Sequence, residues 1–562
     1  MRFTLRTRTV TALAVVAAAT TLSTFGSAAA PRFFDDDPVW VERDTEDASG
    51  MKPLEVDLVT DLAVNLINRS APRNPVQAQN LNSVGEVPDS SWFTNRAGFS
   101  PLTAADVARG PDRTSGPAQG VWTVTSSKSD GVTPGFTIKD AQGRRWFLKF
   151  DPRGFRGMTT GTEVTATKLM WALGYHVPEN HIAYMRRDQL VVGPTAKFTP
   201  TGGRARTMRE DDLDRLLEGV DREADGSYRV VASLALDGKP IGRIRFEGTR
   251  PDDPNDIVPH QNRRELRGYG VFAAWLNHVD AKAINSLDTL VTDGGRAVVR
   301  HHLIDFGSSL GSGGVGPADR WAGTQYLVDP TAIGRQLIGF GFTSPAPQRA
   351  AFYESRSIGR LQRSHEEFDP RAWKPRVPNQ AFLHARPDDQ FWAAQKLAAL
   401  TTDLLRAAVN AGEFRDPEAE AFLAGALAER RDAIVRTYLP AVNPIADPTL
   451  DGDGRLTFRN AAVDADVARA PQVYQAVWLE FDNATHSNRF LGTSRSASTY
   501  MRAPAPLPTR DGAYVKVELS STSAEHPTWL APVHAYFRLQ GGAWRLVGFE
   551  RMPSPRQPST VR

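Results

Sequence analysis

Two short stretches decide the fold of this chain. The first reads His278-Val279-Asp280-Ala281-Lys282-Ala283-Ile284-Asn285 and follows an amphipathic segment, Arg264 to Leu276, that predicts a helix. The second reads Leu303-Ile304-Asp305-Phe306-Gly307 and ends the segment 287–305, which predicts two strands joined by a turn at Asp293-Gly294-Gly295. Each stretch places a carboxylate directly after a regular element, where rigid scaffolds typically carry functional side chains.

A lysine and a glutamate upstream extend this set. Three segments rich in β-branched and aromatic residues predict an antiparallel meander that ends near Lys149: Val121 to Ser127, Phe136 to Lys139 and Trp146 to Phe150. The helix predicted over Thr162–Leu173 is capped by Thr162 and closed by Gly174. It carries Glu163 in its first turn, where the carboxylate can pair with Lys149.

This order of residues matches the needs of phosphoryl transfer. The reaction needs a cation on the phosphates, an acid that orients it, oxygen ligands for a metal ion and a carboxylate that orients the nucleophile. Each residue alone also has a simpler explanation. Lys149 can extend from a strand end into solvent, and Glu163 suits a first helical turn. Asparagine and aspartate are common in turns, so Asn285 and Asp305 can both be turn residues.

The combination resembles the protein-kinase-like superfamily over about residues 120–440. The run from Leu303 to Gly311 is similar to the metal-binding segment of phosphoinositide kinases, and the context also resembles HipA-like kinases and secreted spore-coat kinases. The resemblance implies an α+β fold. It implies a two-lobed kinase-like domain, here with an N-terminal helical and irregular extension and a small C-terminal all-β domain.

The resemblance also implies a role for each residue. Lys149 would contact the phosphates of ATP, and Glu163 would fix Lys149. Asp280 would orient the acceptor hydroxyl, and Lys282 would neutralise the transferred phosphoryl group. Asn285 and Asp305 would bind Mg²⁺ or Mn²⁺.

The chain departs from the family pattern at the phosphate loop. No G-x-G-x-x-G run precedes Lys149, and the nearest equivalent runs from Gly131 to Gly135, whose backbone N–H groups could cradle phosphates. Val279 stands where an arginine usually precedes the catalytic aspartate, so control by a phosphorylated activation loop is not expected. No A-P-E segment follows Asp305.

Composition divides the chain into four parts. Residues 1–29 predict a signal peptide, and residues 30–118 an extension with a helix from Glu55 to Arg69. The kinase-like domain is predicted over 119–440, with lobes at about 119–240 and 241–440, and a β-rich domain over 455–562. The alternating patterns in this last domain predict strands over Val473 to Phe481, Tyr514 to Leu519, Val533 to Leu539 and Trp544 to Phe549. Within the large lobe, residues 387–411 and 417–437 predict helices.

The first 29 residues predict export. Arg2, Arg6 and Arg8 precede an apolar run and small residues of the A-x-A kind, so the expected location is the cell envelope or the outside of the cell, with no transmembrane segment after cleavage. The chain has no cysteine, which excludes disulfides and thiolate chemistry. The net charge is +3, but removal of the segment with Arg2, Arg6 and Arg8 would leave a nearly neutral protein, which argues against nucleic acid as a partner.

Three functions remain open on the sequence. The first is an exported atypical kinase that transfers phosphate from Mg-ATP to a protein, lipid or small-molecule acceptor. The second is a nucleotide-binding pseudokinase or a nucleotidyl transferase. The third is a cell-envelope interaction protein that binds a partner through the C-terminal β domain.

Overall fold

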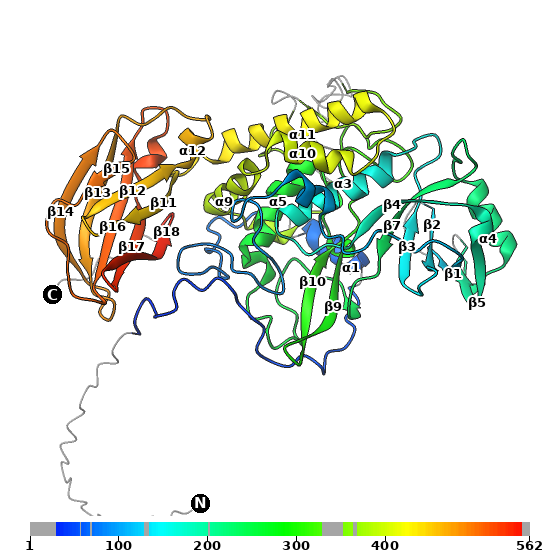
Figure 1. The fold of residues 1–562 in the computed structure, drawn as a ribbon, viewed down its shortest axis with the longest axis horizontal. Helices are drawn as coiled ribbons and strands as arrows, with labels where there is room; N and C mark the ends of the chain where they lie inside the picture. The colour runs from blue at the N-terminus through cyan, green and yellow to red at the C-terminus, as the bar shows by residue number, and fades with distance from the viewer. Residues whose placement is uncertain are drawn as a thin grey trace, which may run out of the picture.

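The computed structural model describes residues 30–56, 58–67, 70–128, 134–200, 203–328, 352–363 and 368–553. A small β lobe lies at one end, a helical lobe in the middle and a β-rich domain at the other end (Figure 1). The predicted α+β fold class, with two lobes, an N-terminal extension and a C-terminal β region, is confirmed. The predicted signal peptide, residues 1–29, lies outside the described residues.

The small lobe is built on a seven-stranded sheet in the order β4-β7-β3-β2-β1-β5-β6. Its strands are β1 (Trp122–Ser127), β2 (Gly135–Lys139), β3 (Arg145–Lys149), β4 (Asn180–Met185), β5 (Leu190–Phe198), β6 (Arg206–Thr207) and β7 (Tyr228–Leu234). The predicted meander is confirmed, because β1, β2 and β3 pair antiparallel in sequence order. Buried Trp122, Trp146 and Tyr228 form the core of this sheet with α4 (Glu210–Glu218).

Helix α3 (Met158–Ala172) begins one turn before its predicted start, so the prediction that Thr162 caps it is wrong. The cap comes from a side chain in the loop between β3 and α3. The Asp151 carboxylate accepts hydrogen bonds from the backbone N–H groups of Gly157 (2.8 Å), Thr159 (2.9 Å) and Thr160 (2.9 Å). These bonds satisfy donors that the first helical turn leaves unpaired. Glu163 therefore lies in the second turn, where it is buried.

The large lobe packs its helices around one apolar core. They are α2 (Ala104–Arg109), α5 (Arg264–Leu276), α8 (Gln380–Leu383), α9 (Pro387–Ala398), α10 (Thr402–Asn410) and α11 (Pro417–Tyr438). The predicted boundaries of α5 are confirmed. The single helix predicted over 387–411 is wrong, because the chain turns after α9 and Thr401 caps α10. The turn lets both Leu397 and Leu405 enter the core.

A second small sheet positions the two chemical stretches. It contains β8 (Lys239–Gly242), β9 (Ser286–Asp293) and β10 (Arg296–Leu303), in the order β10-β9-β8. The β9–β10 hairpin pairs in full register, from Arg296 opposite Asp293 to Leu303 opposite Ser286. The loop that ends at Asn285 and the segment that begins at Ile304 therefore leave the same end of one hairpin.

The C-terminal domain holds a three-stranded and a five-stranded sheet. Its elements are β11 (Ile445–Leu450), β12 (Arg455–Asn460), α12 (Ala461–Asp464), β13 (Val473–Phe481), β14 (Asn488–Ser496), β15 (Tyr500–Arg502), β16 (Tyr514–Thr522), β17 (Val533–Gln540) and β18 (Ala543–Glu550). The sequence predicted β13, β16, β17 and β18. Strand β14 was missed because most of its residues are polar and none is fully buried, so it shows no apolar alternation.

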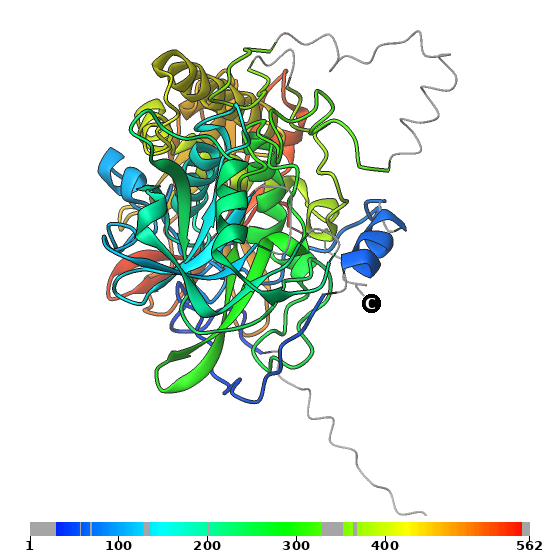
Figure 2. The ribbon, with the colours of Figure 1, turned by 90° about the vertical axis from the view of Figure 1, so that its right-hand side faces the viewer.

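The N-terminal extension joins the C-terminal domain to the large lobe. Phe33 inserts among the aromatic rings of Phe481, Tyr514 and Tyr536. The chain then runs to the three-stranded sheet of β8, β9 and β10, where Leu54 N–H donates to Ile241 O of β8 (2.8 Å). Helix α1 (Leu58–Ile67) follows on the flank of the large lobe, well inside the predicted segment (Figure 2). Among the described residues, the structure has no helix that is long and apolar enough to cross a membrane.

Candidate active site

A cavity of about 590 Å³ lies between the small-lobe sheet and the β9–β10 hairpin. Six of the eight residues predicted for the site line this cavity: Lys149, Glu163, Asp280, Lys282, Asn285 and Asp305. They come from β3, from α3, from the loop after α5 and from the segment after β10. The fold therefore brings together residues that are up to 156 positions apart in the chain (305 − 149 = 156). A cavity of this volume suits a small ligand or a nucleotide.

Lys149 is held between two carboxylates. Its Nζ lies 3.1 Å from Glu163 Oε2 and 2.9 Å from Asp305 Oδ1. Burial opposes the charge on the lysine, but the two carboxylates outweigh it and raise the pKa of Lys149. The enclosed surroundings of Asp305 would raise its pKa, but the Lys149 ammonium outweighs them and lowers it to about 2. Both side chains are therefore charged at neutral pH.

Glu163 also fixes the segment that follows β10. Its second oxygen, Oε1, accepts a hydrogen bond from Phe306 N–H (3.0 Å) and one from Asn180 Nδ2 (3.4 Å). Gly307 lies so close that an added Cβ would come within 3.1 Å of Glu163 Oε2. One buried carboxylate thus sets the positions of both Lys149 and the Asp305-Phe306-Gly307 turn.

The loop after α5 supplies a second group of charges. Lys282 Nζ lies 2.8 Å from Asp280 Oδ1. Asn285 Nδ2 donates to the backbone oxygen of Asp280 (2.9 Å) and to Asp280 Oδ2 (3.2 Å). These contacts hold Asp280 in place. They also leave the amide oxygen of Asn285 as the atom with which it can bind a cation.

The residues present fit a divalent metal ion. Asp305 has a left-handed backbone conformation (φ 60°) and 43% of its side chain is exposed to the cavity, so its carboxylate can be reached. Together with the amide oxygen of Asn285 it offers oxygen donors, which Mg²⁺ and Mn²⁺ prefer. Asp305 and Asn285 would hold the ion, as the sequence suggests.

A buried histidine, His278, stabilises the loop after α5. His278 Nδ1 lies 2.9 Å from Ser309 Oγ, which ties the loop after α5 to the segment after Gly307. Burial lowers the pKa of His278 to about 4, so the ring is neutral near pH 7. His278 therefore has a structural role, and it adds no charge to the cavity.

The two glycines that the sequence suggested as a phosphate cradle, Gly131 and Gly135, are not found among the residues that line the cavity in the described part of the chain. Gly131 lies outside the described residues. Gly135 begins β2 opposite Lys149 and does not line the cavity. An added Cβ at Gly135 would come 2.3 Å from Leu148 O, so this glycine allows the close approach of two strands. From the described part of this loop, Ser127 and Lys128 do line the cavity.

The sequence missed the residues that close the cavity on its other sides. Ser233 and Leu234 line it from the end of β7, and Leu236 lines it from the segment that follows this strand. Arg243 also lines it, and its Nη1 donates to Ile284 O (2.8 Å) and Ser286 O (2.9 Å). No motif marks Arg243, because its partners are backbone carbonyls that only the tertiary structure brings near.

A cluster of Asp112, Glu179 and His181 lies outside this cavity, with ligand atoms within 4.8 Å of one another. The protein's own cations already contact it. Lys168 Nζ contacts Asp112 Oδ2, and Arg113 Nε lies 3.0 Å from Glu179 Oε1. These charges balance the carboxylates, so the cluster serves as an ion-pair network that joins α3 to the segment after α2.

Comparisons with known proteins add little to this geometry. No protein-family model matches the chain, and no curated protein does. Among solved structures it is similar to the Helicobacter pylori proinflammatory kinase CtkA, with a TM-score of 0.29, 12% identity, and coverage of 56% of this chain and 96% of that one. It is also similar to the Golgi casein kinase, with a TM-score of 0.26, 9% identity, and coverage of 72% and 95%. Both are kinases, but likeness at this level carries no argument about function.

Proposed function

We propose that this protein is an atypical kinase-like phosphotransferase that moves the γ-phosphoryl group of ATP to an acceptor hydroxyl. The observation that carries the proposal is the position of Lys149, which contacts Glu163 and Asp305 at 3.1 and 2.9 Å on the wall of a nucleotide-sized cavity. In protein kinases, a lysine on the third strand likewise pairs with a glutamate on the following helix. The pattern of residues 1–29 supports an exported protein.

In this mechanism Lys149 binds the phosphates and Glu163 keeps it oriented. Asp305 and Asn285 would hold Mg²⁺, which would neutralise charge on the phosphates. Asp280 accepts the proton of the acceptor hydroxyl while that oxygen bonds to the γ-phosphorus and the bond from phosphorus to the ADP oxygen breaks. Lys282, 2.8 Å from Asp280, neutralises charge on the transferred group.

A thermal melt with and without Mg-ATP tests the nucleotide site. A ligand at about 100 times its Kd stabilises a protein by about 2.7 kcal/mol, so the wild type should melt at a clearly higher temperature with Mg-ATP. Asp305→Asn should lose this shift. Asp293→Asn, the same change at an exposed position in β9, should keep it. No shift in the wild type would refute ATP-dependent phosphotransfer.

Labelled nucleotides separate the alternative reactions. Transfer of label from γ-labelled ATP supports a kinase, whereas transfer from α-labelled ATP identifies a nucleotidyl transferase. Binding without any transfer or hydrolysis identifies a pseudokinase. These outcomes differ in which bond of the nucleotide breaks, so one pair of reactions distinguishes them.

The interaction hypothesis also has a specific observation in its favour. Phe490 on β14 is 63% exposed and Tyr500 on β15 is 51% exposed, so the C-terminal domain presents aromatic side chains to a partner. Phe490→Ser should weaken binding of such a partner and leave the Mg-ATP shift unchanged. An unchanged affinity would exclude this face.

A further inference from the structure

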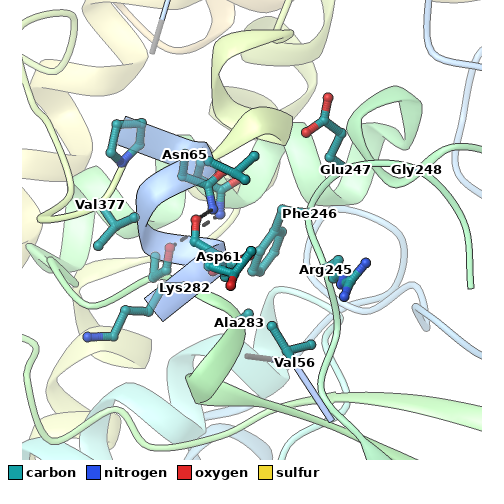
Figure 3. Close-up of a pocket in the computed structure, with 15 residues that line it drawn as sticks. Val56, Asp61, Asn65, Arg245, Phe246, Glu247, Gly248, Lys282, Ala283 and Val377 are labelled. Atoms are coloured by element: carbon teal, nitrogen blue, oxygen red, sulfur yellow. Dashed lines mark hydrogen bonds between the residues drawn. The ribbon is translucent and has the colours of Figure 1, made fainter. Parts of the chain in front are cut away.

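A second cavity, of about 280 Å³, lies under α1 and beside the loop after α5, which carries Asp280 and Lys282 (Figure 3). Its walls include Asp61 from α1, Arg245 and Glu247 from the segment after β8, and Lys282 from the loop. Lys282 also lines the large cavity, so the two cavities share this residue. A molecule that lies across Lys282 can therefore contact both.

The size of the second cavity limits what it can hold. Sites for drug-sized ligands occupy about 300–1,000 Å³. At about 280 Å³ this cavity is too small for a second nucleotide, and it suits one extended side chain or a group of similar size. Its floor is apolar, because Phe246, Ala281 and Val377 are buried there.

The charges around the floor favour a cation. Asp61 and Glu247 contribute two carboxylates to the lining and Arg245 contributes one cation, which acts on Asp61. Lys282 reaches the walls too, but its ammonium lies 2.8 Å from Asp280. Burial raises the pKa of Asp61 although Arg245 opposes the shift, which indicates a poorly solvated carboxylate. A side chain with an alkyl stem and a terminal cation matches this cavity, because the stem can pack on the apolar floor and the cation can approach the carboxylates.

The mouth of the cavity favours a polypeptide as the source of that cation. Val64 of α1 lines the cavity and is 41% exposed, and Ile67, three residues further along, is 79% exposed. Residues three apart lie on one side of a helix, so both present apolar surface next to the mouth. An extended peptide would cover this surface, whereas a free small amine would not.

We infer that this cavity recognises a lysine or arginine side chain of a polypeptide acceptor, next to the hydroxyl that Asp280 orients. The inference rests on the proposed phosphotransferase function and assigns its substrate class. The hydroxyl-bearing residue enters the large cavity, and the basic residue passes Lys282 into the second one. Asp61 and Glu247 select for it.

Synthetic peptides with one serine test this inference on the full chain. Arginine is placed at each position from three before the serine to three after it, and matched peptides carry glutamate or norleucine there. With Mg-ATP, we expect the best arginine peptide to be phosphorylated about tenfold faster than its glutamate counterpart, because one charge is attracted and the other repelled. Slow ATP hydrolysis is measured in the same samples.

Variants connect the preference to the cavity. Asp61→Asn and Glu247→Gln should each reduce the preference for arginine severalfold, and Asp61→Arg should shift it toward glutamate, with ATP hydrolysis unchanged. Asp293→Asn is the control.

Hydrolysis without a basic preference, or a preference that the variants do not change, would overturn the inference and leave the proposed function intact. Phosphorylation of ethanolamine but of no peptide would also overturn it. Absence of Mg-ATP binding and of hydrolysis would instead refute the function.

Discussion

Glu163 accepts a hydrogen bond from the backbone N–H of Phe306 at 3.0 Å while its other oxygen lies 3.1 Å from Lys149 Nζ. One buried carboxylate thus couples a cation on β3 to the turn that carries Asp305. The residues that we propose to bind phosphate and metal are therefore positioned together. Because α3 is buried along nearly its whole length, this coupling is built into the core.

We expect Glu163→Gln to reduce phosphotransfer about a hundredfold, because Lys149 loses one of its two partners and small displacements are costly in catalysis. Glutamine keeps an oxygen that can accept from Phe306, so the fold should lose only about 1–3 kcal/mol. Initial rates and urea unfolding measure the two effects. Glu218→Gln, at an exposed position in α4, is the control and should change neither.

Lys149→Met should abolish the melting shift with Mg-ATP. The change removes both ion pairs and leaves two carboxylates facing each other, so the pKa of Asp305 should rise from its low value of about 2. Isothermal titration with Mg-ADP measures the loss of affinity. Lys139→Met, an exposed lysine in the adjacent strand, should bind like the wild type. Retained affinity in Lys149→Met would show that this lysine does not contact the phosphates.

Asp151→Ala should destabilise the protein by about 2 kcal/mol, the upper range for loss of a helix cap. Its carboxylate accepts three backbone hydrogen bonds at the start of α3, at 2.8–2.9 Å. Asp151→Asn keeps one accepting oxygen, so it should lose less. Urea unfolding of the two variants gives the comparison. Equal losses would mean that the attraction between the Asp151 charge and Arg229, rather than capping, dominates.

Acid should destabilise the protein through its buried histidines. Burial lowers the pKa of His278 to about 4, of His302 to about 4 and of His176 to about 3, from about 6.5 in the unfolded chain. Between about pH 6.5 and 4 the unfolded chain binds more protons, so the free energy of unfolding falls as the pH falls, by up to about 1.4 kcal/mol per pH unit for each histidine.

Urea unfolding between pH 7.5 and 4.5 measures this slope. His278→Asn should make the slope shallower, because asparagine removes the titrating ring and keeps a polar atom near Ser309. His486→Asn, at an exposed position, should leave the slope unchanged. A slope that is the same in all three proteins would show that folding does not change the pKa of His278.

Phe33→Ala should destabilise the C-terminal domain by about 3–5 kcal/mol, the usual loss for a buried phenylalanine. The ring lies 5.0 Å from that of Tyr536 and 6.1 Å from that of Phe481, centroid to centroid. Hydrogen exchange of β16, β17 and β18 should accelerate. Phe34→Ala is the matched control, because Phe34 is 57% exposed. Unchanged exchange in Phe33→Ala would show that the extension does not stabilise this domain.

Much of the architecture could be predicted because it follows local patterns. The bounds of α5 and β13 agree with the prediction to the residue, since their apolar residues recur with helical or strand periodicity. The start of α3 could not be predicted, because its cap is the side chain of Asp151 and not a neighbouring residue. The break between α9 and α10 depends on packing against a core built from distant segments.

The sequence by itself determined the chemical groups of the site and their order: Lys149, Glu163, Asp280, Asn285 and Asp305. A motif consists of residue types at a given spacing. The position of a residue after a strand or helix determines where its side chain leaves that element. The tertiary structure decided what these groups do to one another. Only the folded chain brings Lys149 within 2.9 Å of Asp305, which sets both of their charges. It alone places Arg243 behind the loop and α1 over the second cavity, because contacts between distant segments leave no periodic signal in the sequence.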